Sequence, residues 1–244
     1  MIFIRERISL RINRFLSHNG VCSRREADRL IEGGHVRIGD RVAVLGDAVE
    51  DGDTVYVDDR IVARESERVI LAYHKPLGVV CTTSEKERPN LTDAIDYPGR
   101  VFPIGRLDKD STGLILLTND GMLADELMRG RNDHEKEYIV RTDKPLTDSV
   151  VQAMEQGVPL PEAMTKPCRI FNRNGKEFHI VLTQGLNRQI RRMCEYFGYR
   201  VMALQRIRFV SITLDDQEEG VWRELDEQEM KGLYEAIGKD TSML

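Results

Sequence analysis

Residues 105–121 read Gly-Arg-Leu-Asp-Lys-Asp-Ser-Thr-Gly-Leu-Ile-Leu-Leu-Thr-Asn-Asp-Gly, and this stretch does most to decide the fold. Asp108 stands between Gly105 and Gly113, and residues 114–117 form an apolar run that predicts a buried strand. The glycines free the backbone on either side of the acid, and the strand would hold the loop rigidly. Asp is also common in solvated turns, where it has no catalytic role. The stretch therefore predicts a strand with a candidate reacting carboxylate directly before it.

The segments around this stretch predict a domain of mixed helices and strands from residue 69 onward. Helices are expected at 122–129, 147–156 and 188–197, and strands at 69–73, 79–82, 114–118, 137–141, 168–171 and 177–182. Several of these strands are adjacent hairpins. The pattern favours an α+β fold on a mostly antiparallel mixed sheet over a doubly wound parallel one.

The N-terminal segment predicts two short helices followed by a small sheet. Ile12, Phe15 and Leu16 are spaced to share one face of a first helix. Ser23 and Glu26 form a capping-box pattern that opens a second helix, which is expected to end at Gly33-Gly34. Strands are expected at 35–38, 41–44 and 54–57, with Gly39-Asp40 as a two-residue type II′ loop between the first two.

Residues 59–68 predict the boundary between two domains. They are charged and show no helical or strand periodicity, which is typical of a linker. We therefore expect a small N-terminal domain over residues 1–62 and a larger domain over residues 63–244.

The charge distribution indicates two basic regions in an acidic chain. The net charge of −5 at first argues against a nucleic-acid partner, whose phosphates need Lys and Arg. Residues 209–244, however, carry ten acidic and three basic side chains, so the other 208 residues have a net charge of +2. Residues 1–41 hold nine Arg against five acids, and residues 185–208 hold six Arg against one. Arg donates hydrogen bonds in a planar fork that suits phosphate, although such residues also simply solvate helix faces.

The remaining composition is that of a soluble globular protein, and we expect it in the cytoplasm. No apolar run approaches the roughly 20 residues that span a bilayer, and charges interrupt the N-terminus before a signal sequence could form. The four cysteines lie far apart without a C-x-x-C pair, which indicates neither a zinc site nor a disulfide framework. Free thiols fit a reducing compartment.

Five segments together resemble one known enzyme family. Residues 9–58 look like an S4 RNA-binding domain, with Arg24 and Arg25 at the start of the second helix. The later segments Lys75-Pro76-Leu77-Gly78-Val79, Gly105-Arg106-Leu107-Asp108, Glu135-Lys136-Glu137-Tyr138 and Gln184 to Met193 match, in order, the four motifs of a pseudouridine synthase domain. The chain is similar to the RsuA/RluB/RluE/RluF family of pseudouridine synthases and is closest to the RluF type. Such an ordered set is far more specific than any one motif.

This resemblance implies a role for particular side chains. Asp108 is expected to be the catalytic residue, Arg191 the cation that pairs with it, and Tyr138 the ring beside the target base. Arg106 is expected to fill the space that the flipped uridine leaves. RNA contacts are expected from these residues: Arg11, Arg14, Arg24, Arg25, Arg106, Arg188 and Arg192.

The resemblance also implies the substrate and the partners. Members of the RluF branch modify large-subunit (23S) rRNA, and some also modify a tRNA, so the expected partner is RNA, as free 23S rRNA or an assembling large subunit. No cofactor or metal is expected, because nucleotide-binding and zinc-protease motifs are missing from the sequence. A monomer is expected. The RluF type can carry a long basic C-terminal tail, whereas residues 209–244 are acidic.

Two other functions fit parts of the sequence. One is a non-catalytic S4-domain RNA-binding protein that assists ribosome assembly; the presence of Asp108, Tyr138 and Arg191 argues against it. The other is a hydrolase that uses the Asp108 carboxylate, which would need a second acid or a metal cluster that the motifs lack.

Overall fold

The computed structural model describes residues 10–50, 52–62, 68–82, 86–129 and 133–238. The backbone divides into two compact units, which we describe separately. The first contains the elements up to residue 62 together with the segments 98–101 and 119–123, which include the start of α4, and the second contains the rest from residue 70 onward.

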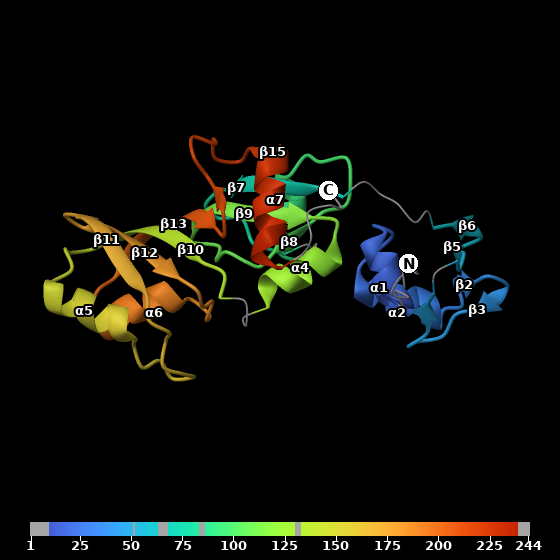
Figure 1. The fold of residues 1–244 in the computed structure, drawn as a ribbon, viewed down its shortest axis with the longest axis horizontal. Helices are drawn as coiled ribbons and strands as arrows, with labels where there is room; N and C mark the ends of the chain where they lie inside the picture. Colours follow the sequence, from blue (N-terminus) through green and yellow to red (C-terminus); the bar gives the residue numbers. More distant parts are fainter. Residues whose placement is uncertain (1–9, 51, 63–67, 83–85, 130–132, 239–244) are drawn as a thin grey trace, which may run out of the picture. The chain divides into compact units, whose positions relative to one another are not determined.

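The N-terminal unit is built from two helices and two small sheets (Figure 1). Its elements are β1 (Leu10–Arg11), α1 (Ile12–His18), α2 (Arg24–Glu32), β2 (Val36–Ile38), β3 (Arg41–Val42), β4 (Ala48–Val49), β5 (Val55–Val57) and β6 (Arg60–Ile61). Strand β1 pairs with β4, and the other sheet has the order β3-β2-β5-β6.

The local sequence signals of this unit are largely confirmed. Ile12, Phe15 and Leu16 are buried on one face of α1. The Ser23 hydroxyl accepts a hydrogen bond from the Glu26 N–H at 3.2 Å, which caps α2. Glu26 does not complete the predicted box, because its carboxylate accepts from Arg29 one turn later at 2.9 Å. Gly39 has the positive φ, 57°, that a two-residue hairpin loop requires at its first position.

The predicted linker is only partly correct. Residues 60–61 form β6, which pairs with β5 through a tight turn in which Asp58 and Asp59 both have positive φ. Asp is one of the few residue types that adopts this backbone readily, so the charged segment makes a hairpin. The rest of the predicted linker, residues 63–67, lies outside the described residues.

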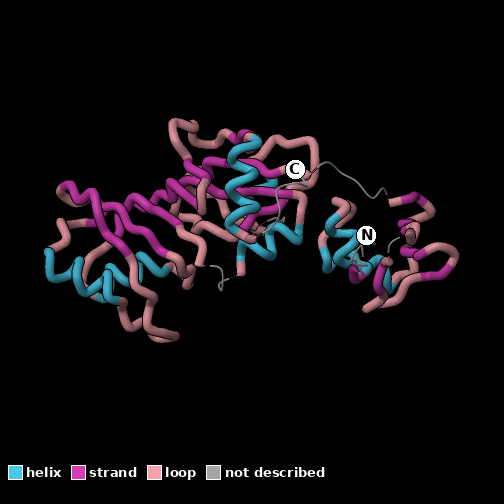
Figure 2. The backbone as a smooth tube through the Cα atoms, in the orientation of Figure 1, coloured by secondary structure: helices cyan, strands magenta, loops and turns pink. Residues whose placement is uncertain are grey.

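The second unit is built around a long sheet with helices at several places (Figures 1 and 2). Its strands are β7 (Ile70–Lys75), β8 (Phe102–Ile104), β9 (Thr112–Thr118), β10 (Lys136–Thr142), β11 (Arg169–Asn174), β12 (Glu177–Leu182), β13 (Val201–Phe209), β14 (Ile212–Thr213) and β15 (Trp222–Glu224). Its helices are α3 (Leu91–Ala94), α4 (Gly121–Met128), α5 (Asp148–Gln156), α6 (Gln189–Tyr196) and α7 (Glu227–Ala236).

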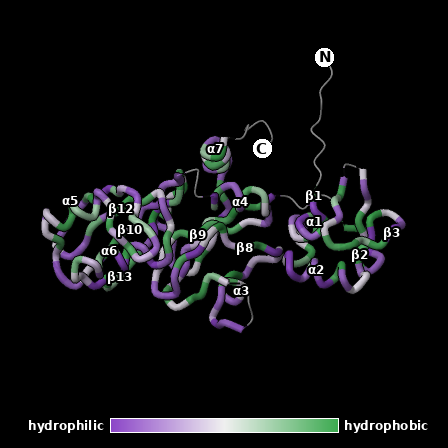
Figure 3. Tube along the Cα trace, turned by 90° about the horizontal axis from the view of Figure 1, so that it is seen from below, coloured by the Kyte–Doolittle hydropathy of each residue, from purple (hydrophilic) through white to green (hydrophobic). Residues whose placement is uncertain are grey.

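The sheet order explains how distant motifs meet. The order is β11-β12-β10-β13-β9-β7-β15, with β14 paired to β13 and β8 paired to β9. All of these pairs are antiparallel except β9 with β13, which is parallel, so the predicted mostly antiparallel mixed sheet is confirmed. Strand β9 is hydrophobic along its length, and residues 114–117 are fully buried (Figure 3). The sequence that follows Asp108 therefore lies at the centre of the sheet.

Two expectations for this unit are wrong. Residues 79–82 form no strand and contribute only an isolated bridge between Val80 and Asn90, because the Val79 carbonyl accepts from the buried Lys75 ammonium instead of a ladder partner. Strand β13, which links the two halves of the sheet, is absent from the predicted elements. Its Arg residues favour a basic surface patch when only the sequence is considered.

The helices cover different parts of the sheet. Figure 1 shows α5 and α6 at the end that carries β11 and β12, and α7 near β7 and β15. Met154 of α5 and Met193 and Cys194 of α6 are buried in one core cluster with Val140 and Ile180 of the sheet. Among the described residues no helix is both long enough and apolar enough to cross a bilayer.

Candidate active site

A cleft of about 1000 Å³ opens in the second unit, on the face of β10 and β13 that Tyr138 shares. The acid loop, residues 105–111, contributes Asp108 to its wall. The segment before α6 contributes Arg188, and the strands contribute Lys136, Tyr138, Arg206 and Phe209. Three of the four motif segments found in the sequence therefore line one cavity.

The fourth segment, residues 75–79, supports the acid loop from behind. Gly78 N–H donates to the Lys109 carbonyl at 2.8 Å, and Leu107 N–H donates to the Cys81 sulfur at 3.3 Å. The Lys75 ammonium is fully buried and donates to the Pro76 and Val79 carbonyls, at 2.8 and 2.9 Å. Burial lowers the pKa of Lys75. The buried Lys75 ammonium thus holds this turn, and the turn fixes the loop that carries Asp108.

Gly113 fixes the other end of the acid loop. It pairs in parallel with Arg206 of β13 and has a φ of 108°. A Cβ atom at this position would lie 2.2 Å from the Arg206 carbonyl oxygen, which is far inside van der Waals contact. Only glycine allows this backbone approach, so the start of β9 is locked against β13.

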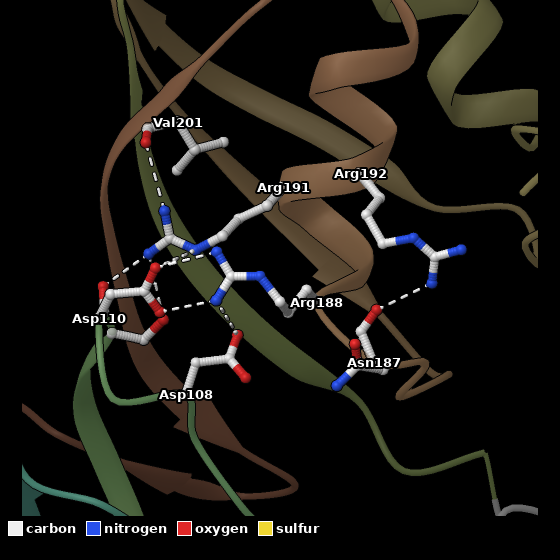
Figure 4. A network of polar contacts seen from close by, with 8 residues as sticks. Asp108, Asp110, Asn187, Arg188, Arg191, Arg192 and Val201 are labelled. Atoms are coloured by element: carbon white, nitrogen blue, oxygen red, sulfur yellow. Dashed lines mark hydrogen bonds and ion pairs between the residues drawn. The ribbon is translucent and has the colours of Figure 1, made fainter.

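Asp108 is partly open to solvent and faces one cation. Its side chain is 30% exposed, and its Oδ2 atom lies 3.9 Å from Nη1 of Arg188. Arg188 makes its shorter contacts with Asp110, donating to both carboxylate oxygens at 3.0 Å (Figure 4). This bidentate contact raises the pKa of Arg188 and lowers that of Asp110. The loop thus holds one fully paired carboxylate, Asp110, and one loosely paired carboxylate, Asp108.

The pairing of Arg191 with Asp108 in the reaction stays a prediction, while the ion pair that Arg191 forms in this structure is with the neighbouring Asp110. Arg191 contacts Asp110 instead, with its Nη2 atom donating to the backbone carbonyl at 2.6 Å and its Nε atom 3.4 Å from the carboxylate. Its Nη1 atom donates to the Val201 carbonyl at 3.2 Å, which ties α6 to β13 (Figure 4). The reason is geometric: Arg188 precedes α6 with a left-handed backbone, φ 48°, and lies nearer to Asp108.

Arg192 and Arg106, both expected to contact RNA, differ in their surroundings. Arg192 turns away from Asp108 and donates to the Asn187 carbonyl at 3.0 Å (Figure 4). It also forms a bidentate pair with Glu162. This pair lowers the pKa of Glu162 to about 2. Arg106 is exposed beside Asp108, and in the described part of the chain it makes no hydrogen bond or ion pair. Arg106 is therefore available to a ligand at the cleft, whereas Arg192 is already paired.

Tyr138 lies among cations on the cleft face of two neighbouring strands. Its cross-strand partner on β13 is Arg206, and Lys136, two residues earlier on β10, shares the same face and pairs with Phe209. Lys136 Nζ and Arg206 Cζ lie 5.6 and 5.5 Å from the centre of the Phe209 ring. Neither residue was predicted as a site residue. Period-2 alternation from Tyr138 would have found Lys136, but the burial of Arg206 has no signal in the sequence.

His134 also lines the cleft, although the sequence offered no function for it. The side chain is 7% exposed, and its Nε2 atom has no hydrogen-bond partner in the described part of the chain. Burial and the neighbouring Lys136 lower the pKa of His134. A neutral imidazole at the cleft wall is the result.

Three of the four arginines expected in the N-terminal unit lie in its two helices, and the fourth, Arg11, ends β1. Arg24 and Arg25 are exposed in the first turn of α2, where helix N–H groups also favour anions. Arg11 is exposed directly before α1, and Arg14 is half-buried within α1. The first turn of α2 is thus a basic surface.

Comparison with family models gives two matches that together span most of the chain. Residues 10–55 match the S4 domain, and residues 69–196 match the RNA pseudouridylate synthase family. The second match covers 128 of the 244 residues.

Comparison with individual proteins gives relatives along nearly the whole chain. The dual-specificity RNA pseudouridine synthase RluF of Escherichia coli O6:H1 is 48% identical over 236 residues, covering 96% of this chain and 81% of the relative. The ribosomal large subunit pseudouridine synthase B of Pseudomonas aeruginosa is 35% identical, covering 93% and 62%. A crystal structure of a pseudouridylate synthase superposes with a TM-score of 0.68 at 29% identity, covering 92% of this chain and all of that one.

Proposed function

The chain belongs to the family of RNA pseudouridine synthases with an N-terminal S4 domain, and from this premise we propose that Asp108 carries out the isomerisation on a flipped-out uridine of 23S rRNA. The reaction class follows from the family. We propose, beyond the reaction class, the residue roles, the RNA target and two domains over residues 1–62 and 63–244.

The chemistry requires a group such as Asp108 at this place. Conversion of uridine to pseudouridine breaks the bond from C1′ to N1 and forms one from C1′ to C5. An ionised carboxylate serves either as a nucleophile at C1′ or as a base toward the sugar, and both routes are compatible with the cleft. The observation that carries the proposal is the contrast within the acid loop: Asp110 is fully paired with Arg188, whereas Asp108 lines the cleft with a single contact at 3.9 Å.

The residues around Asp108 support base flipping. A uridine in folded RNA must leave its stack, at a cost of a few kcal/mol that pocket contacts offset. Tyr138 offers a ring face in the cleft for the extruded uracil, because aromatic stacking binds bases well. The exposed, unpaired Arg106 is the side chain we assign to the space that the base leaves.

The RNA is held, in this proposal, by surfaces on both units. Arg24 and Arg25, with Arg11 and Arg14 nearby, supply the phosphate contacts of the S4 domain. Arg188 supports Asp108 as its cation, and Arg191 supports the acid loop through Asp110. We propose a monomer that acts in the cytoplasm on large-subunit rRNA. Relatives named as dual-specificity RNA pseudouridine synthases support a second RNA substrate, for which we propose a tRNA.

Replacement of the catalytic acid tests the reaction. Asp108→Asn keeps the shape of the side chain but removes the charge, so product formation should fall below detection while RNA affinity stays within about two-fold. Asp110→Asn is the matched control in the same loop, and its rate should fall by no more than a few-fold. Substantial pseudouridine formation by Asp108→Asn in a single-turnover assay would contradict the assignment.

Charge removal from the S4 domain tests docking. Arg24→Gln/Arg25→Gln should weaken RNA binding and flatten its dependence on log salt by roughly 1 for each phosphate that is no longer neutralised. Arg60→Gln, in β6 of the same unit, is the control and should leave the slope unchanged. Equal slopes for all three proteins would remove α2 from the RNA interface.

The RNA target is tested by mapping pseudouridine in rRNA and tRNA from cells with and without the gene. A 23S site that is lost on deletion and restored by wild type, but not by Asp108→Asn, supports the proposal. Loss confined to tRNA, or no loss at all, would overturn the 23S assignment.

A further inference from the structure

Two cations in the cleft wall, Lys136 and Arg206, form no ion pair in the described part of the chain. Arg206 is 3% exposed, and its Nε atom donates to the Leu114 carbonyl at 2.7 Å. Lys136 is half-buried, and its ammonium donates to the His134 carbonyl at 2.9 Å. Neither forms an ion pair with a described Asp or Glu side chain. Buried charges in proteins are usually paired, so the cleft here presents positive charge toward its contents.

The position of these cations relative to Tyr138 is set by strand register. Arg206 stands directly opposite Tyr138, and Lys136 is its neighbour on the same face of β10. Side chains in such positions lie about 5 to 7 Å apart at their Cβ atoms. A base stacked on Tyr138 would therefore have the ammonium and the guanidinium near its edge. The Phe209 ring, which both cations approach, also lines the cleft.

The reaction places negative charge on the base itself. When the bond from C1′ to N1 breaks, its electron pair leaves with uracil, which becomes an anion delocalised over N1 and the C2 oxygen. On one route Asp108 forms a C1′–O bond with the sugar, which breaks again when C5 attacks C1′. On the other route Asp108 takes the C2′ proton and returns it to C2′ when the bond from C1′ to C5 forms. The electron pair is used again when C5 bonds to C1′, and the proton lost from C5 balances the proton gained by N1. No oxidant, reductant or other reactant is needed.

We propose that Lys136 and Arg206 stabilise the detached uracil anion, so that both are catalytic residues of the cleft. This inference rests on the proposed function, because it uses Asp108 as the group that acts on the sugar and Tyr138 as the stacking ring. Fixed cations are effective at such a task, since they are already oriented when the charge develops and need no reorganisation.

The test uses Lys136→Met in the full chain, with RNA at saturating concentration and a single turnover. The rate of isomerisation should fall by about 100-fold or more, which is typical for loss of one group that stabilises developing charge. RNA affinity should stay within about two-fold. Lys136→Arg keeps the charge and should recover most of the rate. Lys144→Met is the matched control, because it removes another Lys from an aromatic ring, that of Tyr199 at 4.6 Å, outside the cleft lining, and should leave the rate unchanged.

A substrate with a better leaving group isolates the electrostatic role. In RNA carrying 5-fluorouridine at the target, fluorine stabilises the departing anion, so breakage of the C1′–N1 bond should suffer less from Lys136→Met than it does with uridine. A merely structural role would give the same loss with both RNAs. If Lys136→Met does not fold, as checked by thermal unfolding, Lys136→Gln is compared on the same two RNAs.

The outcomes separate this inference from the proposed function. Full activity of Lys136→Met beside an inactive Asp108→Asn overturns only the inference. A loss seen in affinity and salt dependence, with an unchanged saturated rate, also overturns it and assigns Lys136 to a phosphate. Activity of Asp108→Asn would overturn the proposed function itself.

Discussion

At the Asp108 end of the cleft, charged side chains largely neutralise one another, whereas at the Lys136 end two cations share one aromatic ring and form no ion pair with a described carboxylate. Arg188 and Arg191 both contact Asp110, and Asp108 keeps one long contact. Lys136 and Arg206 donate to backbone carbonyls and approach the ring of Phe209. The first arrangement positions the Asp108 carboxylate. The second leaves positive charge available to the uracil anion that we propose forms in the cleft.

Gly113→Ala should break this comparison most severely, because Gly113 joins the two ends. The new Cβ would collide with the Arg206 backbone, and φ 108° is unfavourable for alanine. We expect destabilisation of roughly 3 kcal/mol or more, since strain and steric overlap add, and loss of most activity. Urea unfolding and single-turnover rates measure both.

Gly175→Ala provides the matched control for that variant. Gly175 also has a positive φ, 57°, but a Cβ there has no neighbour within 4 Å. Gly175→Ala should lower the free energy of unfolding by only about 1 kcal/mol and leave activity intact. Similar losses for the two variants would show that backbone strain alone, rather than contact with β13, explains Gly113.

The pH dependence of the rate sharpens the comparison at the Lys136 end. Burial and the charge of Arg206 lower the pKa of Lys136 to about 8, against a smaller opposing effect of Asp133. The groups around it are Arg206 and Phe209 from β13 and His134 and Asp133 before β10. Only the ammonium form stabilises an anion, so the saturated rate should fall as pH rises through about 8. Lys136→Arg should move this fall to higher pH.

Folding stability should show the opposite trend in the same pH range. The unfolded chain holds the Lys136 proton up to about 10.5, whereas the folded chain releases it near 8. Between these values the unfolded state binds more protons, so this residue makes stability rise with pH. Urea unfolding at pH 7 and pH 9 measures the effect, and Lys136→Met should abolish this contribution. A rate and a stability that fall together would contradict the assignment.

Asp110→Asn should have the smallest effect on rate and stability, because it changes the Asp108 end of the cleft, where Arg188 and Arg191 both contact Asp110. The pair with Arg188 is open to solvent, so stability should fall by about 1 kcal/mol or less, and the rate by a few-fold. Hydrogen bonding from Arg188 lowers the pKa of Asp110, so its contribution is present above its ordinary pKa and is lost as pH falls through the lowered one. Wild type and variant should therefore converge in acid unfolding experiments. A larger loss than that of Gly113→Ala would reverse the comparison.

The sequence predicts the acidic end of the cleft better than the cationic end. Asp108 and the strand after it were found because a Gly-bounded loop and an apolar run are local signals. The helices at 122–129, 147–156 and 188–197 were likewise placed within one or two residues by their apolar periodicity. The roles of Asp108, Tyr138 and Arg191 in the reaction stay predictions.

Partners that depend on the folded chain were less accessible. The sequence does not show which of three neighbouring Arg residues approaches Asp108, since this depends on the left-handed backbone at Arg188. Strand β13 was missed because its charged residues suggest a surface, although Arg206 is buried by strands on both sides. Residues 79–82 were mistaken for a strand because they are apolar. In the folded chain the Val79 carbonyl accepts a hydrogen bond from the buried Lys75 ammonium and not from a neighbouring strand.

The parallel pairing of Gly113 with Arg206 has a consequence for how such an enzyme can diverge. This strand pair, together with the turn at residues 75–79, sets the spacing between the acid loop and the cations. Substitutions in loops that contact RNA can therefore change which RNA is bound, while the distances between the acid and the cations stay constant. RNA recognition and catalysis depend on separate parts of the chain, so recognition can change in evolution while catalysis is retained.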